Sequence, residues 1–207
     1  MKLAICTPTR DTVHADFAFS LASLVGDLVS QGVTVALINA NGADIAKQRC
    51  EGVLFAKKHL ADKLLFIDSD MKFPPYMARR LLEAKGPIVG PAVCRRAMPF
   101  RMNTEPELRL DGTTTEYMEV NRLGTGIMLI DMAVFAKLPM PWFQSEYQGE
   151  KAGAHTWRSE DEFFCDRARM AGFTITVDVA LTAQIAHIGS YPYTILDAVA
   201  TQQVANA

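Results

Sequence analysis

Apolar and polar positions alternate in a regular order over the first 95 residues. Short apolar or β-branched runs at 3–6, 33–38, 64–67 and 88–94 predict strands. The segments between them have apolar positions at helical spacing and predict helices at 13–30, 45–59 and 75–84. Asp11 or Thr12 is expected to cap the first helix, and Asp44 the second. Strands that alternate with helices predict a mainly parallel sheet with right-handed crossovers.

The pattern changes after residue 95. Residues 95–115 have no clear periodicity and contain Arg95, Arg96, Arg101 and Arg109. A long irregular segment in a compact domain is usually functional or mobile. The rest of the chain is predicted to form strands at 117–120, 127–130 and 174–179, helices at 131–138 and 159–172, a turn with a short strand at 139–143, a polar loop at 144–158, and a helix or frayed tail at 191–207.

Composition narrows the class of protein. A chain of 207 residues that is 49% hydrophobic suits one domain with a sizeable core. The net charge of −2 argues against broad nucleic-acid binding, although it leaves a local basic groove open. No signal peptide or membrane span is predicted, so we expect a cytoplasmic protein. Four cysteines without CxxC spacing are expected to be buried reduced thiols, at Cys6, Cys50, Cys94 and Cys165.

The most informative stretch is Asp68-Ser69-Asp70, which directly follows the apolar run 64–67. This places both acids at the carboxyl end of a predicted parallel strand, where open α/β sheets bind ligands. Two carboxylates are costly to desolvate unless a cation neutralises them, and Mg²⁺ or Mn²⁺ with a substrate phosphate would suit. His187 could be a third ligand for Mn²⁺. The alternative is a polar turn that caps the next segment.

A second acidic site occurs at residues 159–162. Ser159 and Glu162 have the spacing of a capping box, which accounts for both structurally. Glu160 and Asp161 remain unexplained by the cap. A carboxylate at a helix start, beside a substrate hydroxyl, can act as a general base.

Gly124-Thr125-Gly126 precedes the predicted strand 127–130. These residues predict either a tight turn or close backbone approach before the strand, or a position where an acceptor or sugar can approach the backbone. The segment is too short for a phosphate loop, and no GxGxxG or Walker pattern occurs. The arginines of residues 95–109 could bind a diphosphate or could simply be solvated surface charge.

Taken in order, these segments resemble the glycosyltransferases of the GT-A fold, similar to the family 2 group. The resemblance is carried by Thr7-Pro8-Thr9 at the opening loop, Phe66-Ile67-Asp68-Ser69-Asp70 as a DxD motif, Leu123-Gly124-Thr125-Gly126 with Met128-Leu129-Ile130 as an acceptor-side segment, Glu160-Asp161 with Phe163-Phe164-Cys165 and Arg167 as an "ED" helix, and His187 as a third metal ligand.

The resemblance implies a single-domain, Rossmann-like α/β/α sandwich of the GT-A type. Residues 1–95 would form the nucleotide-binding half, residues 96–190 the acceptor half, and residues 191–207 a tail or helix. The implied reaction moves a sugar from a nucleotide-diphosphate sugar to a hydroxyl acceptor that the sequence does not identify, and a homo-oligomer is left open.

The resemblance also implies roles for individual residues. Asp70 and His187 would hold Mn²⁺ or Mg²⁺ at the diphosphate, and Asp68 would face the metal or the ribose. Asp161, or else Glu160, would deprotonate the acceptor if the reaction inverts the anomeric centre. The remaining implied contacts are Thr7, Pro8, Thr9, Arg10, Asp44, Arg49 and Ser69 with the nucleotide, and Gly124, Thr125 and Gly126 with the acceptor.

Several features leave alternatives open. Related sequences often have an Arg-Asn pair where this chain has Arg49-Cys50, and failure of the Asp161 assignment would make a retaining reaction plausible. A catalytically silent nucleotide-sugar or carbohydrate binding module is one alternative. A nucleotidyltransferase would need a glycine-rich basic loop, which residues 7–11 lack. A glycosyltransferase that acts on modified DNA bases through residues 95–109 is a third.

Overall fold

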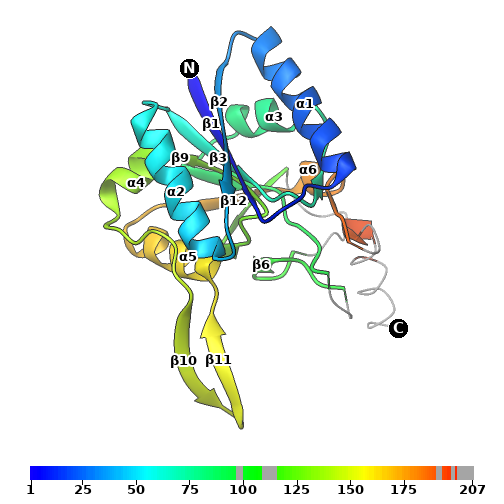
Figure 1. Ribbon diagram of the computed structural model, residues 1–207. Helices are drawn as coiled ribbons and strands as arrows, with labels where there is room; N and C mark the ends of the chain where they lie inside the picture. The colour runs from blue at the N-terminus through cyan, green and yellow to red at the C-terminus, as the bar shows by residue number, and fades with distance from the viewer. Residues whose placement is uncertain (97–99, 109–115, 190–192, 197–198, 200–207) are drawn as a thin grey trace.

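A seven-stranded sheet forms the centre of the molecule (Figure 1). The computed structural model describes residues 1–96, 100–108, 116–189, 193–196 and 199. The strands lie in the order β2-β1-β3-β9-β5-β12-β7. Their bounds are β1 Lys2–Thr9, β2 Thr34–Asn41, β3 Lys63–Ile67, β5 Ile88–Gly90, β7 Tyr117–Val120, β9 Ile127–Asp131 and β12 Ile175–Asp178.

Most strands of this sheet run in one direction. β1 pairs in parallel with both β2 and β3, and β5 pairs in parallel with β12. β9 lies antiparallel between β3 and β5, and β7 lies antiparallel at the edge beside β12. β2, β1, β3, β5 and β12 therefore share a direction, and the predicted mainly parallel sheet is confirmed.

Helices cover both faces of the sheet, and the strand sequences show why. Successive strand residues point to opposite faces, so Leu64 and Phe66 enter one buried cluster while Leu65 and Ile67 enter the other. The first cluster includes apolar residues of α2 and α5, and the second includes those of α1 and α3. The helices are α1 Ala15–Ser30, α2 Ile45–Lys58, α3 Met77–Glu83, α4 Met132–Lys137, α5 Glu160–Met170 and α6 Val179–Thr182. The predicted α/β/α layering is confirmed.

Two small sheets of short strands lie outside the seven-stranded sheet. β4 (Met71–Lys72) pairs with β13 (Ala186–His187), which also pairs with β14 (Tyr193–Thr194). β6 (Thr104–Glu105) pairs with β8 (Arg122–Leu123). Of the predicted tail, residues 193–196 and 199 are described: strand β14 comes first, and residues 195, 196 and 199 are helical. Arg109 lies outside the described residues.

Local predictions at two element ends need correction. The N-cap of α1 is His14, whose ring accepts a hydrogen bond from the amide of Asp16, rather than Asp11 or Thr12. The helix starts later because residues 11–13 continue the loop after β1. The predicted strand 88–94 ends at Gly90, and Cys94 instead forms an isolated bridge with Met102. Asp44 caps α2 as predicted, since its carboxylate accepts from the amide of Lys47 at 3.2 Å.

The predicted polar loop at 144–158 is wrong, because this segment is an antiparallel hairpin. β10 (Glu146–Lys151) and β11 (Ala154–Arg158) form a ribbon that projects from the body of the molecule (Figure 1). Ala152 and Gly153 form its turn with φ of 51° and 79°. Both faces of the ribbon are largely exposed, so the strands lack the apolar alternation that would have predicted them. The short strand expected within 139–143 is also absent from this described segment, where Trp142 and Phe143 pack into the core.

The four cysteines are buried, as predicted, and none of them forms a disulfide in the described part of the chain. Burial raises the pKa of the Cys6 and Cys165 thiols to about 12. No helix in the described residues is long and apolar enough to cross a membrane.

Two helical glycines provide a matched test of how α2 packs on the sheet. A Cβ on Gly52 of α2 would lie 2.6 Å from Cys6 Sγ, whereas a Cβ on Gly26 of α1 would meet nothing within 4 Å. We expect Gly52→Ala to lower the free energy of unfolding by about 1–3 kcal/mol through overpacking. Gly26→Ala should raise it by up to about 1 kcal/mol, because alanine is the better helix former. Urea denaturation measures both, and equal effects of the two variants would contradict the close contact.

Candidate active site

Three adjoining cavities lie along the edge of the sheet where β1 and β3 end. The first, here the loop cavity, has a volume of about 460 Å³ and lies beside the β1 and β3 loops. The central cavity, about 240 Å³, shares Ile45 and Asp68 with it. The outer cavity, about 650 Å³, shares Asn103, Glu160 and Asp161 with the central one. The three cavities therefore adjoin one another through shared lining residues.

Asp68 begins the site at the end of β3. Its amide donates to the carbonyl of Gly126 at 2.8 Å, which fixes the backbone against the start of β9. Its carboxylate oxygens lie 3.1 and 3.4 Å from Nη2 of Arg49. Burial raises the pKa of Asp68 above its ordinary value, and the charge of Arg49 offsets only part of that effect.

Arg49 connects the two acidic motifs of the sequence. It projects from α2, its side chain is 3% exposed, and its Nε lies 3.2 Å from Oε1 of Glu160. Burial disfavours its charge, but Asp68 and Glu160 together raise the pKa of Arg49. Its Nη1 has no hydrogen-bond partner among the described residues. Arg49, expected to lie close to the diphosphate of the nucleotide or to Asp68, contacts Asp68 and lines the central cavity as a bridge between two carboxylates.

Asp70 faces different partners from Asp68. Its Oδ2 lies 3.0 Å from Nη1 of Arg96 and 3.4 Å from Nε2 of His187. The pairing of β4 with β13 and a 2.7 Å bond from the Ile188 amide to the Asp70 carbonyl hold these segments together. Burial acts to raise the pKa of Asp70, but the hydrogen bond with His187 and the charges of His187 and Arg96 outweigh it and lower the pKa.

The arrangement around His187 fits a divalent cation. Its Nδ1 lies 2.9 Å from the carbonyl oxygen of Cys94, which only accepts hydrogen bonds, so Nδ1 carries a hydrogen. In the neutral ring, Nε2 then presents a lone pair toward the Asp70 carboxylate, and a proton or a metal ion is needed between them. A backbone carbonyl on the second ring nitrogen is typical of metal-binding histidines, and the oxygen and nitrogen donors suit Mn²⁺.

The third predicted ligand does not join this pair directly. The carboxylate of Asp68 is turned toward Arg49. In the described part of the chain, no group of three or more His, Cys, Asp or Glu side chains is arranged to hold a metal ion. Of the three predicted ligands, Asp70 and His187 therefore contact each other, and Asp68 does not join them.

The loop cavity contains some of the predicted nucleotide contacts. Pro8, Thr9, Arg10 and Ser69 line it. Thr7 is 6% exposed within β1, and Asp44 serves as the cap of α2. Neither lines this cavity.

Gln48 is a lining residue of the loop cavity that sequence reasoning missed. It is buried, and its amide donates to the carbonyls of Thr9 and Ala40, so it ties the β1 loop to β2. The sequence signal for Gln48 would have been a polar residue on the face of α2 that packs against the sheet.

Across the central cavity, the N-terminus of α5 presents Glu160 and Asp161. The predicted capping box is confirmed: the Glu162 amide donates to Ser159 Oγ, and the Ser159 amide donates to Glu162 Oε2 at 3.1 Å. Oδ1 of Asp161 accepts from the Ser159 hydroxyl and from the Glu162 amide. Burial raises the pKa of Glu160, with Arg49 acting in the opposite direction.

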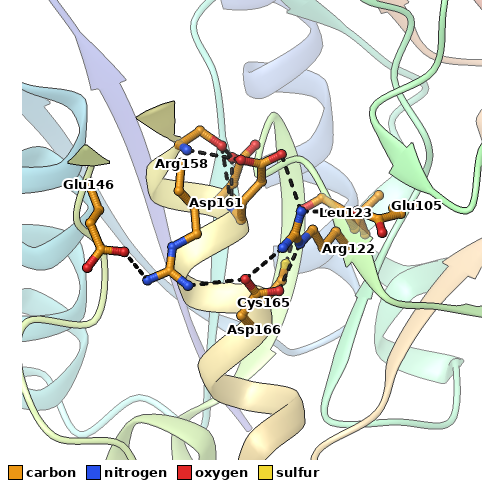
Figure 2. A network of polar contacts seen from close by, with 10 residues as sticks. Glu105, Arg122, Leu123, Glu146, Arg158, Asp161, Cys165 and Asp166 are labelled. Atoms are coloured by element: carbon orange, nitrogen blue, oxygen red, sulfur yellow. Dashed lines mark hydrogen bonds and ion pairs between the residues drawn. The ribbon is translucent and has the colours of Figure 1, made fainter. Parts of the chain in front are cut away.

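An ion-pair network fixes this end of α5 (Figure 2). Arg122 of β8 contacts both carboxylate oxygens of Asp166 at 2.8 Å and Glu105 at 3.1 Å. Arg158, at the base of the hairpin, contacts Asp166 at 3.2 Å and also pairs with Glu146. Burial acts to raise the pKa of Asp166, but these two arginines outweigh it and lower the pKa. The network joins α5, β8 and the hairpin, and two of its members, Glu105 and Arg122, line the outer cavity.

The glycine segment lines the central cavity, as its approach to a ligand would require. A Cβ on Gly124 would lie 2.2 Å from Nδ2 of Asn103, and one on Gly126 would lie 3.0 Å from Cε of Met71. Thr125 is 1% exposed. Protein side chains thus make the close approach at these glycines, and the approach of an acceptor or sugar stays a prediction.

The fold has counterparts among solved structures. A197 from STIV matches with a TM-score of 0.58 and 17% identity, over 91% of this chain and 86% of that one. A mutant of Drosophila β-1,4-galactosyltransferase 7, in complex with manganese, UDP-Gal and xylobiose, matches with a TM-score of 0.55 and 19% identity, over 91% of this chain and 71% of that one. No protein-family model and no curated protein sequence matches the chain. The GT-A-like fold predicted from the sequence is confirmed.

The bridge made by Arg49 generates a prediction about stability. Arg49→Met should lower the free energy of unfolding by about 3–5 kcal/mol, because it leaves two partly buried carboxylates, 28% and 13% exposed, without their counter-charge. Arg79→Met is the matched control, since Arg79 is 45% exposed in its side chain and pairs with Asp27 at 3.4 Å. Its loss should cost less than about 1 kcal/mol. Urea denaturation at neutral pH compares them, and a mild effect of Arg49→Met would contradict the bridging role.

Proposed function

We propose that this chain is a metal-dependent glycosyltransferase that moves a sugar from a nucleotide-diphosphate sugar to a hydroxyl acceptor. One observation carries the proposal: two acidic segments far apart in the sequence line the same small cavity. Asp68 and His187 line it from one side and Glu160 and Asp161 from the other. A GT-A-like fold in which these two acidic segments meet would provide binding positions for a donor and a metal, and a carboxylate to act as base.

The donor would lie in the loop cavity, with its diphosphate near Asp70. Asp70 and His187 would hold Mn²⁺ or Mg²⁺, which when bound would act as a Lewis acid on the diphosphate leaving group. Asp68 would keep its pairing with Arg49 and limit the space left for the sugar. Because the galactosyltransferase of similar fold binds UDP-Gal and manganese, UDP-sugars with Mn²⁺ are the first donors to test.

Asp161 would serve as the general base of an inverting reaction. The acceptor oxygen would bond to the anomeric carbon as its bond to the diphosphate oxygen breaks, and the hydroxyl proton would pass to the carboxylate. Glu160 is less suited because Arg49 binds its Oε1. Oδ1 of Asp161 is held by Ser159 and Glu162, and the described residues provide no partner for Oδ2, so that oxygen can receive a proton.

The outer cavity would bind the acceptor. Arg95, Arg101 and Arg122 line it together with Glu105, Glu107, Glu160, Asp161 and Glu162. This mixture of donors and acceptors suits a neutral polyhydroxylated molecule such as a carbohydrate. The acids would repel a polyanion, so the lining favours a sugar acceptor over a DNA base.

The first test of this function is metal-dependent donor binding. With a UDP-sugar present at about 100 times its Kd in Mn²⁺, the wild-type protein should gain about 2.7 kcal/mol of stability. Asp70→Asn should lose the Mn²⁺-dependent part of the thermal shift, whereas Asp27→Asn, a control on α1, should retain it. A panel of UDP-, GDP- and dTDP-sugars covers the donor classes. Full metal-dependent binding by Asp70→Asn would refute its role, and no shift with any donor would refute the proposed function.

The second test separates catalysis from binding. Asp161→Asn preserves the shape and the Oδ1 acceptor but removes the base, so the rate of sugar transfer should fall about 10²- to 10⁴-fold. Donor binding, measured by calorimetry, should stay within about twofold. Glu160→Gln is the companion variant, and a larger loss of rate there than in Asp161→Asn would reassign the base to Glu160. Donor binding by the wild type without transfer to any acceptor would instead indicate a silent binding module.

A further inference from the structure

Arg96 contacts the carboxylate oxygen of Asp70 that faces His187. Its Nη1 lies 3.0 Å from Asp70 Oδ2 and 3.3 Å from the carbonyl oxygen of Ile188, and Nε2 of His187 lies 3.4 Å from the same Oδ2. Arg96 also lines the loop cavity, beside Asp70 and Ser69. A permanently charged guanidinium therefore lies at the position from which a cation would approach Asp70.

The ion pair of Arg96 with Asp70 is more exposed to solvent than the contacts of Arg49. The side chain of Arg96 is 46% exposed, whereas that of Arg49 is 3% exposed and contacts two acids. A half-exposed ion pair contributes little stability, because water competes for both charges. Arg96 can thus leave Asp70 at low cost, while Arg49 cannot leave Asp68.

We propose that Arg96 is an internal counter-cation, which neutralises Asp70 in the metal-free protein and moves to the donor diphosphate when metal and nucleotide bind. This inference rests on the proposed function. The metal takes the place of the guanidinium at Oδ2, and the displaced guanidinium then has a matching ligand in the phosphate oxygens of the same cavity.

The exchange makes the binding of metal and nucleotide cooperative. Metal alone must displace Arg96 without providing it with a new partner, so its binding is weakened. Metal together with a nucleoside diphosphate gives Arg96 that partner, so the two ligands strengthen each other, as linkage requires. Arg96 therefore disfavours Mn²⁺ binding in the absence of the nucleotide.

Two calorimetric titrations test this exchange, because the same variant should bind Mn²⁺ more tightly and UDP more weakly than the wild type. Titrated with Mn²⁺ alone, Arg96→Gln should bind up to about fivefold more tightly than the wild type, since a competing exposed ion pair is removed. Titrated with UDP at saturating Mn²⁺, the same variant should bind about tenfold more weakly, since a charge-assisted hydrogen bond to phosphate is lost. Asp70→Asn should abolish the Mn²⁺ signal and so identify the site.

Arg10→Gln is the matched control for charge. Arg10 lines the same cavity but makes no ion pair with Asp70 among the described contacts. Its removal should leave the affinity for Mn²⁺ alone within about twofold. An equal gain in Arg10→Gln and Arg96→Gln would show a general charge effect and overturn the proposal.

The outcomes distinguish this inference from the proposed function. Unchanged or weaker Mn²⁺ binding by Arg96→Gln overturns the role of Arg96 as a competitor, as does an absence of Mn²⁺ binding in both proteins. Unchanged UDP affinity overturns its movement to the diphosphate. If the wild type binds Mn²⁺ but neither UDP nor GDP, the proposed donor class fails, and the Mn²⁺ comparison still decides whether Arg96 competes for Asp70.

Discussion

The site depends on one buried ion-pair bridge, from Asp68 through Arg49 to Glu160. A buried arginine is stable only where carboxylates compensate its charge, and each of these carboxylates in turn needs the arginine. The bridge holds the end of β3 and the start of α5 at a fixed separation across the central cavity. It also determines which acids remain available, because Asp70 and Asp161 are the members of the two acidic motifs that do not contact Arg49.

The sheet topology explains why these residues meet. β1 and β3 run in parallel and end at the same edge, so that Thr9 and Asp68 both line the loop cavity. β9 enters antiparallel beside β3, so it begins where β3 ends, and the glycine segment before it reaches Asp68. Gly126 is suited to this position, because a Cβ there would lie 3.0 Å from Met71 and 3.7 Å from the Asp68 carboxylate. The directions of the strands therefore bring segments that are distant in sequence to the lining of one cavity.

The sequence predicted those parts of the structure that local patterns encode. The strands and helices of the first 95 residues, the cap at Asp44 and the capping box at Ser159 all follow from periodicity and capping chemistry. The hairpin at 146–158 was missed because it has no buried face, and the N-cap of α1 was misplaced because no local signal distinguishes a loop residue from a cap there. The resemblance to a known fold placed Arg49 near Asp68 and His187 near Asp70, and both pairs are in contact. The contact of Arg96 with Asp70 was not predicted, because no local pattern links a residue of the irregular segment to the end of β3.

Asp68 and Asp70 belong to one motif but pair with different arginines, Arg49 and Arg96, which differ in burial. Arg49 is buried, touches two carboxylates and has a raised pKa, so it acts as a permanent part of the framework. Arg96 is half-exposed and shares Asp70 with a histidine whose second nitrogen is already held by a backbone carbonyl. Under the proposed function, the site would need one acid that stays neutralised and one whose counter-charge can be exchanged for a metal. Asp68 would meet the first requirement and Asp70 the second. Their pKa values differ for a physical reason: burial raises the pKa of Asp68 beyond what Arg49 offsets, whereas burial of Asp70 is outweighed by His187 and Arg96, which lower its pKa.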